Sequence, residues 1–448
     1  MNLEEMTLED FLENPIPCSC GRIHSFSMKA IEICSGALES IPALVKTNGY
    51  KKPFILSDIN TYKAAAAKLT AYLEQDGIPF SLFVLKDSAL VPDEKTLGSV
   101  LMHFDPSCDL LIAVGSGTVN DITRFTSHRL KLPYFIAATA PSMDGYASTV
   151  APLIRNNLKT TFECHMPQAI IADLDIVSQA PMEMIAAGFG DILGKYTSLV
   201  DWKLSAIIND EYYCDTIVDI MRISLERTIA LHEGAAKRDK AAIGKLMEAL
   251  VLAGIAMSYA GNSRPASGSE HHLSHFWEMR YLLDGRKAVL HGSKVGIAAA
   301  LVLKLHQYLK EENLSPTSIK NSPLPSNTNW EPEIRRVYGK AAEGILELEK
   351  TAQKNAPHKH TERIKAAAKH WDEIMAVLNT LPPPQTVIDL LTSVQGPVHP
   401  SQVGIDRELV KDGVLYAKEL RARYTVLQLL WDLDLLPSYA ERLADWQI

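Results

Sequence analysis

The stretch Leu110-Leu-Ile-Ala-Val-Gly-Ser-Gly-Thr-Val-Asn-Asp121 predicts a strand, a glycine-rich turn and a helix in direct succession. An apolar run such as 110–114 is typical of a strand that is buried on both faces. Glycines in the turn let backbone N–H groups approach a phosphate, and the N-terminus of the following helix favours its negative charge. The third glycine of a dinucleotide-binding fingerprint is absent, so these residues alone favour a phosphate site and a simple tight turn about equally.

Similar apolar runs lie on both sides of this stretch, at 53–58, 80–85, 134–139 and 169–173. Helical patterns such as 62–75 separate them, which predicts a mostly parallel, Rossmann-like sheet covered on both faces. From residue 181 onward nearly every segment has helical spacing. We therefore predict a nucleotide-binding α/β domain over 1–180 and an all-α domain over 181–448, with an exposed loop or insertion at 314–330.

Composition limits the function classes. The chain has 448 residues and a formal net charge of −8, and it contains no block of basic residues. A nucleic-acid partner or an anionic membrane surface is therefore disfavoured. The six cysteines are scattered and form no disulfide framework, the first residues lack a signal-peptide pattern, and the apolar stretch 249–260 is too short to span a bilayer. We expect a cytoplasmic enzyme without a membrane span.

Polar residues follow two of the predicted strands. Asp58 ends one of them, where its carboxylate could accept hydrogen bonds from ribose hydroxyls or cap the next helix. The segment 139–148 leaves another strand, and its small polar side chains could line a nicotinamide or hold substrate hydroxyls. Proline, serine and glycine are also ordinary turn residues, which is the favoured interpretation of this segment by itself.

A histidine-rich stretch, Ser267-Gly-Ser-Glu-His-His-Leu-Ser-His-Phe-Trp277, predicts a metal site. His271 and His275 are one helical turn apart, and His291 follows in a similar setting. Asp191 offers a carboxylate at the expected start of a helix, and one Asp with two His suits a catalytic divalent cation. Each residue taken alone is as well explained by a helix cap or an amphipathic helix. His272 points about 100° around the helix from His271, so we expect it either to support the ligands indirectly or to be structural.

The N-terminal segment Cys18-Ser-Cys20-Gly-Arg-Ile-His24 combines two thiols and an imidazole. One residue separates the thiols and no second cysteine pair completes a tetrahedral set, which favours a structural hairpin over a metal site.

Taken together, these motifs resemble the iron-containing alcohol dehydrogenase and dehydroquinate synthase superfamily. Within it, the chain most resembles the sn-glycerol-1-phosphate dehydrogenases of the bacterial, AraM-like branch. The resemblance runs over most of the chain, and its most specific block is Arg264-Pro-Ala-Ser-Gly-Ser-Glu270. The other segments that carry it are 18–24, 115–121, 141–148, 188–195, 271–275, 291–296 and 418–425. The resemblance implies a dehydroquinate synthase-like fold.

The resemblance also implies site residues. Asp191, His271 and His291 would bind the catalytic metal, which is zinc in the archaeal branch and nickel in the bacterial one. Asp144 would face the substrate or the metal. The residues expected to contact NAD(H) or NADP(H) are Gly115, Gly117, Thr118 and Asp121, with Asp58 near the adenosine ribose and Thr139, Ser142 and Ser148 near the nicotinamide.

The expected reaction is the reversible reduction of dihydroxyacetone phosphate to sn-glycerol 1-phosphate, a step of phospholipid biosynthesis. His275 is a candidate proton relay, and Lys159, Lys195 or Lys294 could neutralise the substrate phosphate. A glycerol dehydrogenase, a dehydroquinate synthase-like lyase and a non-catalytic relative are the alternatives. Asp58 weakly favours NAD over NADP. We expect a homo-oligomer, with a dimer favoured.

Overall fold

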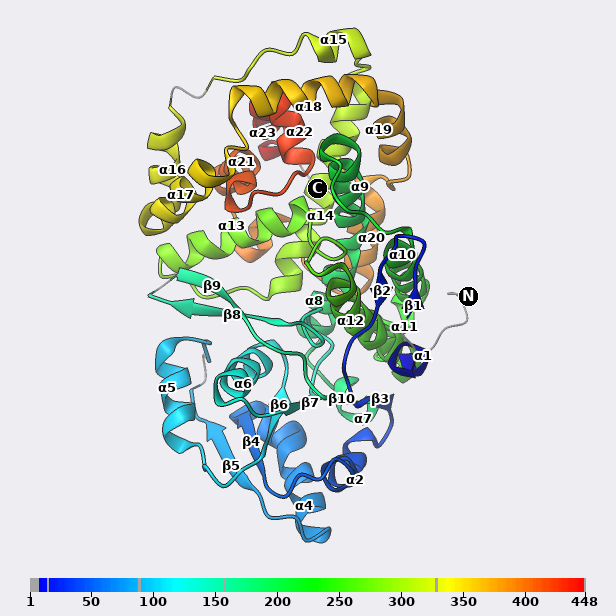
Figure 1. The fold of residues 1–448 in the computed structure, drawn as a ribbon, viewed down its shortest axis with the longest axis vertical. Coiled ribbons are helices and arrows are strands. Elements are labelled where there is room, and N and C mark those ends of the chain that lie inside the picture. Colours follow the sequence, from blue (N-terminus) through cyan, green and yellow to red (C-terminus); the bar gives the residue numbers. More distant parts are fainter. Residues whose placement is uncertain (1–7, 14–15, 88–89, 157, 327–328, 447–448) are drawn as a thin grey trace. The chain divides into compact units, whose positions relative to one another are not determined.

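The computed structural model describes residues 8–13, 16–87, 90–156, 158–326 and 329–446 (Figure 1). Two compact units can be distinguished. Unit 1 comprises Met1–Ile192 and Asp219–Asn262, and unit 2 comprises Leu193–Val218 and Ser263–Ile448. The domain boundary expected near residue 180 stays a prediction.

Unit 1 is built on a six-stranded parallel sheet in the order β3-β10-β7-β6-β4-β5. Its strands are β3 (Ala30–Cys34), β4 (Pro53–Asp58), β5 (Ser81–Leu85), β6 (Leu110–Gly115), β7 (Tyr134–Ala138) and β10 (Ala169–Asp173). All except β3 coincide with the predicted apolar runs. The predicted α/β fold class is confirmed.

Helices cover both faces of this sheet. On one face, Ile55 and Ile112 belong to a buried apolar cluster that includes residues of α2 (Ile41–Thr47) and α4 (Ala67–Gln75). On the other face, the buried Tyr134 hydroxyl accepts a hydrogen bond of 2.9 Å from Arg124 Nε of α6 (Gly117–Leu130). Strands enclosed in this way cannot show the alternating pattern of a half-exposed sheet, which is why their sequences are continuously apolar.

The remaining elements of unit 1 are short, apart from one long helix. They are the hairpins β1 (Ile16–Pro17) with β2 (Ile23–His24) and β8 (Val150–Arg155) with β9 (Leu158–Glu163), and the helical segments α1 (Leu8–Glu13), η1 (Ala37–Ser40), α3 (Ile59–Thr61), the π-helical η2 (Tyr62–Ala66), α5 (Glu94–His103), α7 (Leu174–Val177), α8 (Met182–Leu193), α11 (His232–Ala236) and α12 (Lys240–Ala260).

Helix α12 is long and apolar enough to cross a membrane by length and composition, and 67% of its most apolar window is buried in the protein. Its buried side chains lie all around the helix, from Ala242 to Ala260. Such burial is typical of a core helix. The helix is longer than the stretch 249–260, so the expectation that its length excludes a membrane span is not confirmed.

Unit 2 is helical. Its elements are α9 (Lys195–Asn209), α13 (Ser269–Leu283), α14 (His291–Glu311), α15 (Pro316–Lys320), α16 (Trp330–Tyr338), η3 (Gly339–Ala341), α17 (Ala342–Ala352), α18 (Pro357–Lys369), α19 (Trp371–Leu378), α20 (Pro384–Ser393), η4 (Pro400–Val403), α21 (Arg407–Tyr416), η5 (Ala417–Leu420), α22 (Val426–Asp432) and α23 (Leu436–Ala444), while α10 (Asp215–Ala230) has residues in both units. The region expected as a loop at 314–330 therefore contains a short helix, α15, which Ser315 caps through the N–H of Ser318 at 3.1 Å.

The expectation that Asp191 starts a helix is wrong. Asp191 lies near the end of α8, and a new helix, α9, begins only at Lys195. The glycines before Asp191 suggested a helix boundary, but Gly188 serves close packing within α8. A Cβ atom at Gly188 would lie 1.8 Å from the carbonyl oxygen of Pro141, so only glycine fits there.

Candidate active site

The carboxyl ends of β4 and β6 form the topological switch point of the sheet. The chain leaves β4 towards β5 on one side and leaves β6 towards β7 on the other, while β4 and β6 pair directly. Open α/β sheets bind their ligands in the crevice outside such a point. Asp58 and Gly115, which end these two strands, therefore lie where the sequence predicts a cofactor.

The glycine turn has the predicted form. Gly115 ends β6 and Gly117 begins α6. A Cβ atom at Gly115 would lie 2.6 Å from the Cβ of Val119, so the turn is too tight for a larger residue. The N-cap residue Ser116 makes no side-chain hydrogen bond to the first turn of α6, so the Ser116 side chain does not cap the backbone N–H groups of that turn, including that of Thr118.

Asp58 acts as a helix cap in this structure. Its Oδ1 accepts hydrogen bonds from the N–H groups of Asn60 at 2.7 Å and Thr61 at 2.9 Å, and Thr61 Oγ1 accepts in return from the Asp58 N–H at 2.9 Å. The capping interpretation offered by the sequence is therefore observed. A ribose contact through Oδ2 is compatible with it.

Arg124 holds the segment after β7, and sequence reasoning missed it. Its buried guanidinium donates to the carbonyl oxygens of Gly145, of Tyr146 at 3.1 Å and of Val150 at 2.9 Å. Asp121 accepts from the same group at 2.9 Å. Asp121 thus acts on the segment after β7 through Arg124. The sequence signal for this ion pair was the spacing of three residues between Asp121 and Arg124 on one helix.

The small polar residues after β7 are placed by backbone contacts. Thr139 donates its N–H to the carbonyl oxygen of Gly115 at 3.1 Å, which holds this segment beside the glycine turn. Ser148 Oγ accepts from the N–H of Val150 at 3.1 Å, a turn interaction. Thr139, Ser142 and Ser148 are all buried, with 7%, 7% and 9% of their surfaces exposed.

Asp144 and Asp191 lie together in unit 1. The backbone N–H of Asp144 donates to Asp191 Oδ2 at 3.0 Å, and the Asp191 side chain is completely buried. The predicted substrate-side aspartate is therefore a direct neighbour of the predicted carboxylate ligand.

Three histidines gather in unit 2. His271 and His275 come from α13, and His291 is the first residue of α14. The ring centroid of His291 lies 5.1 Å from that of His271 and 5.4 Å from that of His275. Ligand nitrogens of His271 and His291 lie within 4.8 Å of each other, close enough to share one cation.

Glu270 fixes the orientation of His271. Its Oε1 lies 2.7 Å from His271 Nδ1, and its other oxygen accepts from Thr197 Oγ1 at 2.6 Å. Burial acts to raise the pKa of Glu270, but the hydrogen bonds from His271, from Thr197 and from the Gly268 N–H outweigh it, so the pKa is lowered and the carboxylate stays ionised. With its proton on Nδ1, a neutral His271 presents Nε2 as the coordinating nitrogen, as in carboxylate–histidine–metal triads.

His275 has a different environment. Its Nδ1 lies 3.5 Å from Glu278 Oε2, and the same oxygen lies 3.7 Å from Lys294 Nζ. Ligand atoms of His275, Glu278 and His291 lie within 4.8 Å of one another, so this combination of two imidazoles and a carboxylate lies entirely within unit 2.

Among the described residues, His272 belongs to neither group of neighbouring ligand atoms that contains His271 or His275. It is completely buried, and burial together with the positive charges of Arg421 and Arg423 lowers its pKa well below the ordinary value. A histidine held neutral in this way is a structural residue of α13.

The loop before α13 is locked by buried polar contacts. Asp201 accepts from the N–H of Ser269 at 2.7 Å and its Oγ at 2.6 Å, and from the N–H of Val426 at 2.6 Å. Burial and the negative charge of Glu270 raise the pKa of Asp201 to about 7. Arg264 donates to the carbonyl oxygen of Tyr424 at 2.7 Å. The block 264–270, the most specific motif of the chain, therefore holds α13 and His271 in position.

The three candidate phosphate-binding lysines lie in different environments. Lys195 is buried and donates to the carbonyl oxygen of Ala266 at 3.2 Å. Lys294 is buried beside Glu278, and Lys159 lies on β9. Two of the three lysines, Lys195 and Lys294, therefore contact other residues of unit 2.

Comparisons with known proteins define the class. A family model described as iron-containing alcohol dehydrogenase matches residues 32–181. The crystal structure of glycerol dehydrogenase from Schizosaccharomyces pombe is similar with a TM-score of 0.59 and 16% sequence identity, covering 94% of this chain and 92% of that one. At this identity the likeness shows the fold alone, which the chain shares with that glycerol dehydrogenase.

Relatives of similar length define the family within this class. Glycerol-1-phosphate dehydrogenase (NAD(P)+) of Halalkalibacterium halodurans is 34% identical over 92% of this chain and 95% of its own length. The protein of that name from Bacillus licheniformis is 34% identical over 94% of this chain and 93% of its own length. The chain belongs to the glycerol-1-phosphate dehydrogenase family.

Proposed function

We propose that this protein is a metal-dependent NAD(P) oxidoreductase that interconverts dihydroxyacetone phosphate and sn-glycerol 1-phosphate by hydride transfer at C2. One observation of the site supports it most: His271 is oriented by the Glu270 carboxylate at 2.7 Å, with the ring of His291 5.1 Å away. This is the arrangement that a catalytic metal needs. The family, whose members are named for this reaction, supplies the substrate.

We propose Asp191, His271 and His291 as the metal ligands. The donor types fit a divalent cation, because two imidazole nitrogens and one carboxylate leave coordination positions for substrate. These donors suit zinc and nickel alike. A cation held there would polarise the C2 carbonyl and stabilise the developing alkoxide.

The protein's own residues supply orientation and proton transfer. Glu270 keeps the His271 ring and tautomer fixed, and Asp144 positions Asp191 through its backbone N–H. His275 Nε2 is proposed to hold the proton that passes to the C2 oxygen during reduction, since Nδ1 of this ring faces Glu278. Lys159, Lys195 and Lys294 stay candidates for the substrate phosphate.

The nicotinamide cofactor is proposed to bind at the switch point of the sheet. The N–H groups around Gly115, Gly117 and Thr118 would contact its diphosphate, and Asp58 the adenosine ribose. Thr139, Ser142 and Ser148 would line the nicotinamide side. Asp121 is proposed as a positioning residue, because it acts on the cofactor side through Arg124.

We further propose a role in phospholipid biosynthesis, a cytoplasmic location and a homo-oligomeric state, with a dimer favoured. None of the chemistry described above requires a particular oligomer.

Substrate specificity tests this function and separates it from glycerol dehydrogenase. Oxidation of NADH and of NADPH is followed with dihydroxyacetone phosphate and with dihydroxyacetone, and the product is assigned as the 1-phosphate or the 3-phosphate. The proposal predicts turnover of the phosphorylated substrate and formation of sn-glycerol 1-phosphate. Equal turnover of dihydroxyacetone, or formation of the 3-phosphate, would contradict it.

A further inference from the structure

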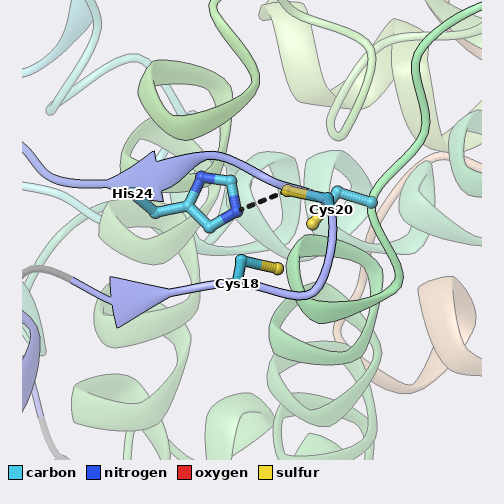
Figure 2. A group of neighbouring side chains, drawn as sticks. Cys18, Cys20 and His24 are labelled. Carbon is cyan, nitrogen blue, oxygen red and sulfur yellow. Dashed lines mark hydrogen bonds between the residues drawn. The ribbon is translucent and has the colours of Figure 1, made fainter.

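The N-terminal hairpin brings three metal-binding side chains together outside the proposed active site. Strands β1 and β2 pair across a tight turn, in which the N–H of Gly21 donates to the carbonyl oxygen of Cys18 at 3.0 Å. Gly21 has a φ of +82°, which glycine adopts without strain. Figure 2 shows the His24 imidazole directed towards Cys20, with Cys18 beside them.

The separations match those of a tetrahedral metal site. Ligand atoms of Cys18, Cys20 and His24 lie within 4.8 Å of one another, and Cys20 Sγ lies 3.5 Å from His24 Nε2. Tetrahedral zinc, with bonds of about 2.3 Å to sulfur and about 2.0–2.1 Å to nitrogen, places two such ligand atoms about 3.5 Å apart. The side chains need little movement to enclose a cation.

Packing within unit 1 fixes the imidazole. His24 is only 1% exposed, and its ring stacks on Tyr259 of α12 with centroids 5.2 Å apart and an interplanar angle of 29°. Phe26 contacts the same tyrosine ring at 5.9 Å. A ligand whose orientation is fixed before binding loses little conformational entropy on coordination.

The hairpin has little apolar packing of its own. Each of its strands has two residues, and Ile16 is buried whereas Ile23 is 71% exposed. Two-stranded hairpins are at best marginally stable in water, and small elements of this kind commonly depend on a bound metal. A cation between the turn and β2 would cross-link the hairpin.

We propose that Cys18, Cys20 and His24 bind a thiophilic divalent cation of the zinc class, as a structural site distinct from the proposed catalytic one. Both thiols lose their protons to solvent on binding, and the neutral imidazole coordinates through Nε2. A water molecule or a further thiolate completes the tetrahedron. The hairpin geometry alone carries this proposal, which holds whether or not the proposed catalytic function is correct.

Metal analysis of three full-length variants tests it. Zinc and nickel are counted per chain in the wild type, in Cys18→Ser/Cys20→Ser, in the matched control Cys34→Ser/Cys164→Ser and in His271→Ala. The proposal predicts that the hairpin double variant loses one zinc that the control and His271→Ala keep. Equal zinc content in the hairpin variant and its control would overturn it.

Cobalt gives a readout that a merely structural role of the cysteines would not produce. Co²⁺ added to chelator-treated wild-type protein should give thiolate-to-cobalt charge-transfer absorption, and the control double variant should give the same band. Absence of that band from the wild type would contradict the proposal.

Thiol counting in the wild type covers the case in which the hairpin variant fails to fold. Two additional cysteines should react with a thiol reagent once a chelator removes the metal, and added Zn²⁺ should protect them again. An unchanged count would overturn the proposal.

Discussion

We propose that Glu270 makes His271, rather than His275, the histidine of α13 that shares a cation with His291. Its contact with His271 Nδ1 at 2.7 Å is shorter than the 3.5 Å between His275 Nδ1 and Glu278. Replacing Glu270 with Gln removes the charge while keeping the shape. We predict a 10- to 100-fold weaker affinity for the catalytic metal, measured by metal titration, because such supporting contacts tune ligand basicity by about that factor.

Glu278→Gln is the matched control for this prediction. Glu278 belongs only to the alternative set with His275 and His291, so its replacement should change the affinity by less than about 3-fold if Asp191, His271 and His291 hold the cation. A larger loss in Glu278→Gln than in Glu270→Gln would assign the metal to the alternative set.

His275→Ala separates a proton relay from a ligand. We predict that this variant keeps its metal while kcat falls by about 10²- to 10⁴-fold, the usual contribution of a positioned acid or base. Metal content and kcat are measured on the same preparation. Loss of the metal along with turnover would make His275 a ligand.

Sequence patterns could predict the histidines but not the residues that hold them. His271 and His275 stand out because imidazoles one helical turn apart can share a site, and His291 follows them in a similar setting. Glu270 is the direct neighbour of His271 in the chain, and adjacent helical residues normally point about 100° apart. Their contact depends on the first turn of α13, where the N–H of Gly268 and the Thr197 hydroxyl hold the carboxylate. A contact between segments far apart in the chain, such as that of Thr197 with Glu270, leaves no pattern in the neighbouring sequence.

Helix α8 illustrates how packing overrides a local boundary signal. Gly188→Ala would force a Cβ atom to 1.8 Å from the carbonyl oxygen of Pro141, a backbone atom that cannot turn away. We predict a loss of unfolding free energy of about 1–3 kcal/mol or more. Chemical denaturation of the variant measures it.

Gly98→Ala in α5 is the matched control, because a Cβ atom there meets nothing within 4 Å. It should leave the unfolding free energy unchanged or raise it by up to about 1 kcal/mol through helix propensity. Equal unfolding free energies of the two variants would contradict the close contact between the Pro141 carbonyl oxygen and Gly188 of α8.

The strands were predictable to the extent that they are buried on both faces. The runs that became β4, β6, β7 and β10 are continuously apolar because helices cover the sheet on each side. Strand β3, at the edge, mixes charged and apolar residues and escaped prediction. The helix start expected at Asp191 was misplaced because glycines selected for close packing look the same in sequence as glycines that end a helix.

At the scale of the whole molecule, a buried histidine predicts how stability depends on pH. His306 of α14 is 1% exposed, and burial, with a smaller effect of Lys310, lowers its pKa to about 3. The unfolded chain binds a proton near its ordinary pKa of 6.5, whereas the folded protein does not. His306 therefore lowers the stability progressively as the pH falls from 6.5 towards 3, by up to about 1.4 kcal/mol per pH unit.

His306→Leu should remove this contribution. Denaturation midpoints at a series of pH values should fall less steeply below pH 6.5 for the variant than for the wild type. His358→Leu replaces an exposed histidine and should keep the wild-type slope. Parallel curves for the wild type and His306→Leu would contradict the prediction.

The central claim is that one metal bound by Asp191, His271 and His291 supports reduction of dihydroxyacetone phosphate. The most direct measurement removes metal from the wild type, His271→Ala and His291→Ala, adds back Ni²⁺ or Zn²⁺, and records bound metal together with NAD(P)H oxidation. Activity of the wild type should return in proportion to the metal bound, while both variants should stay inactive with their fold intact by circular dichroism. Full activity of the metal-stripped wild type, or wild-type activity of either variant, would contradict the claim.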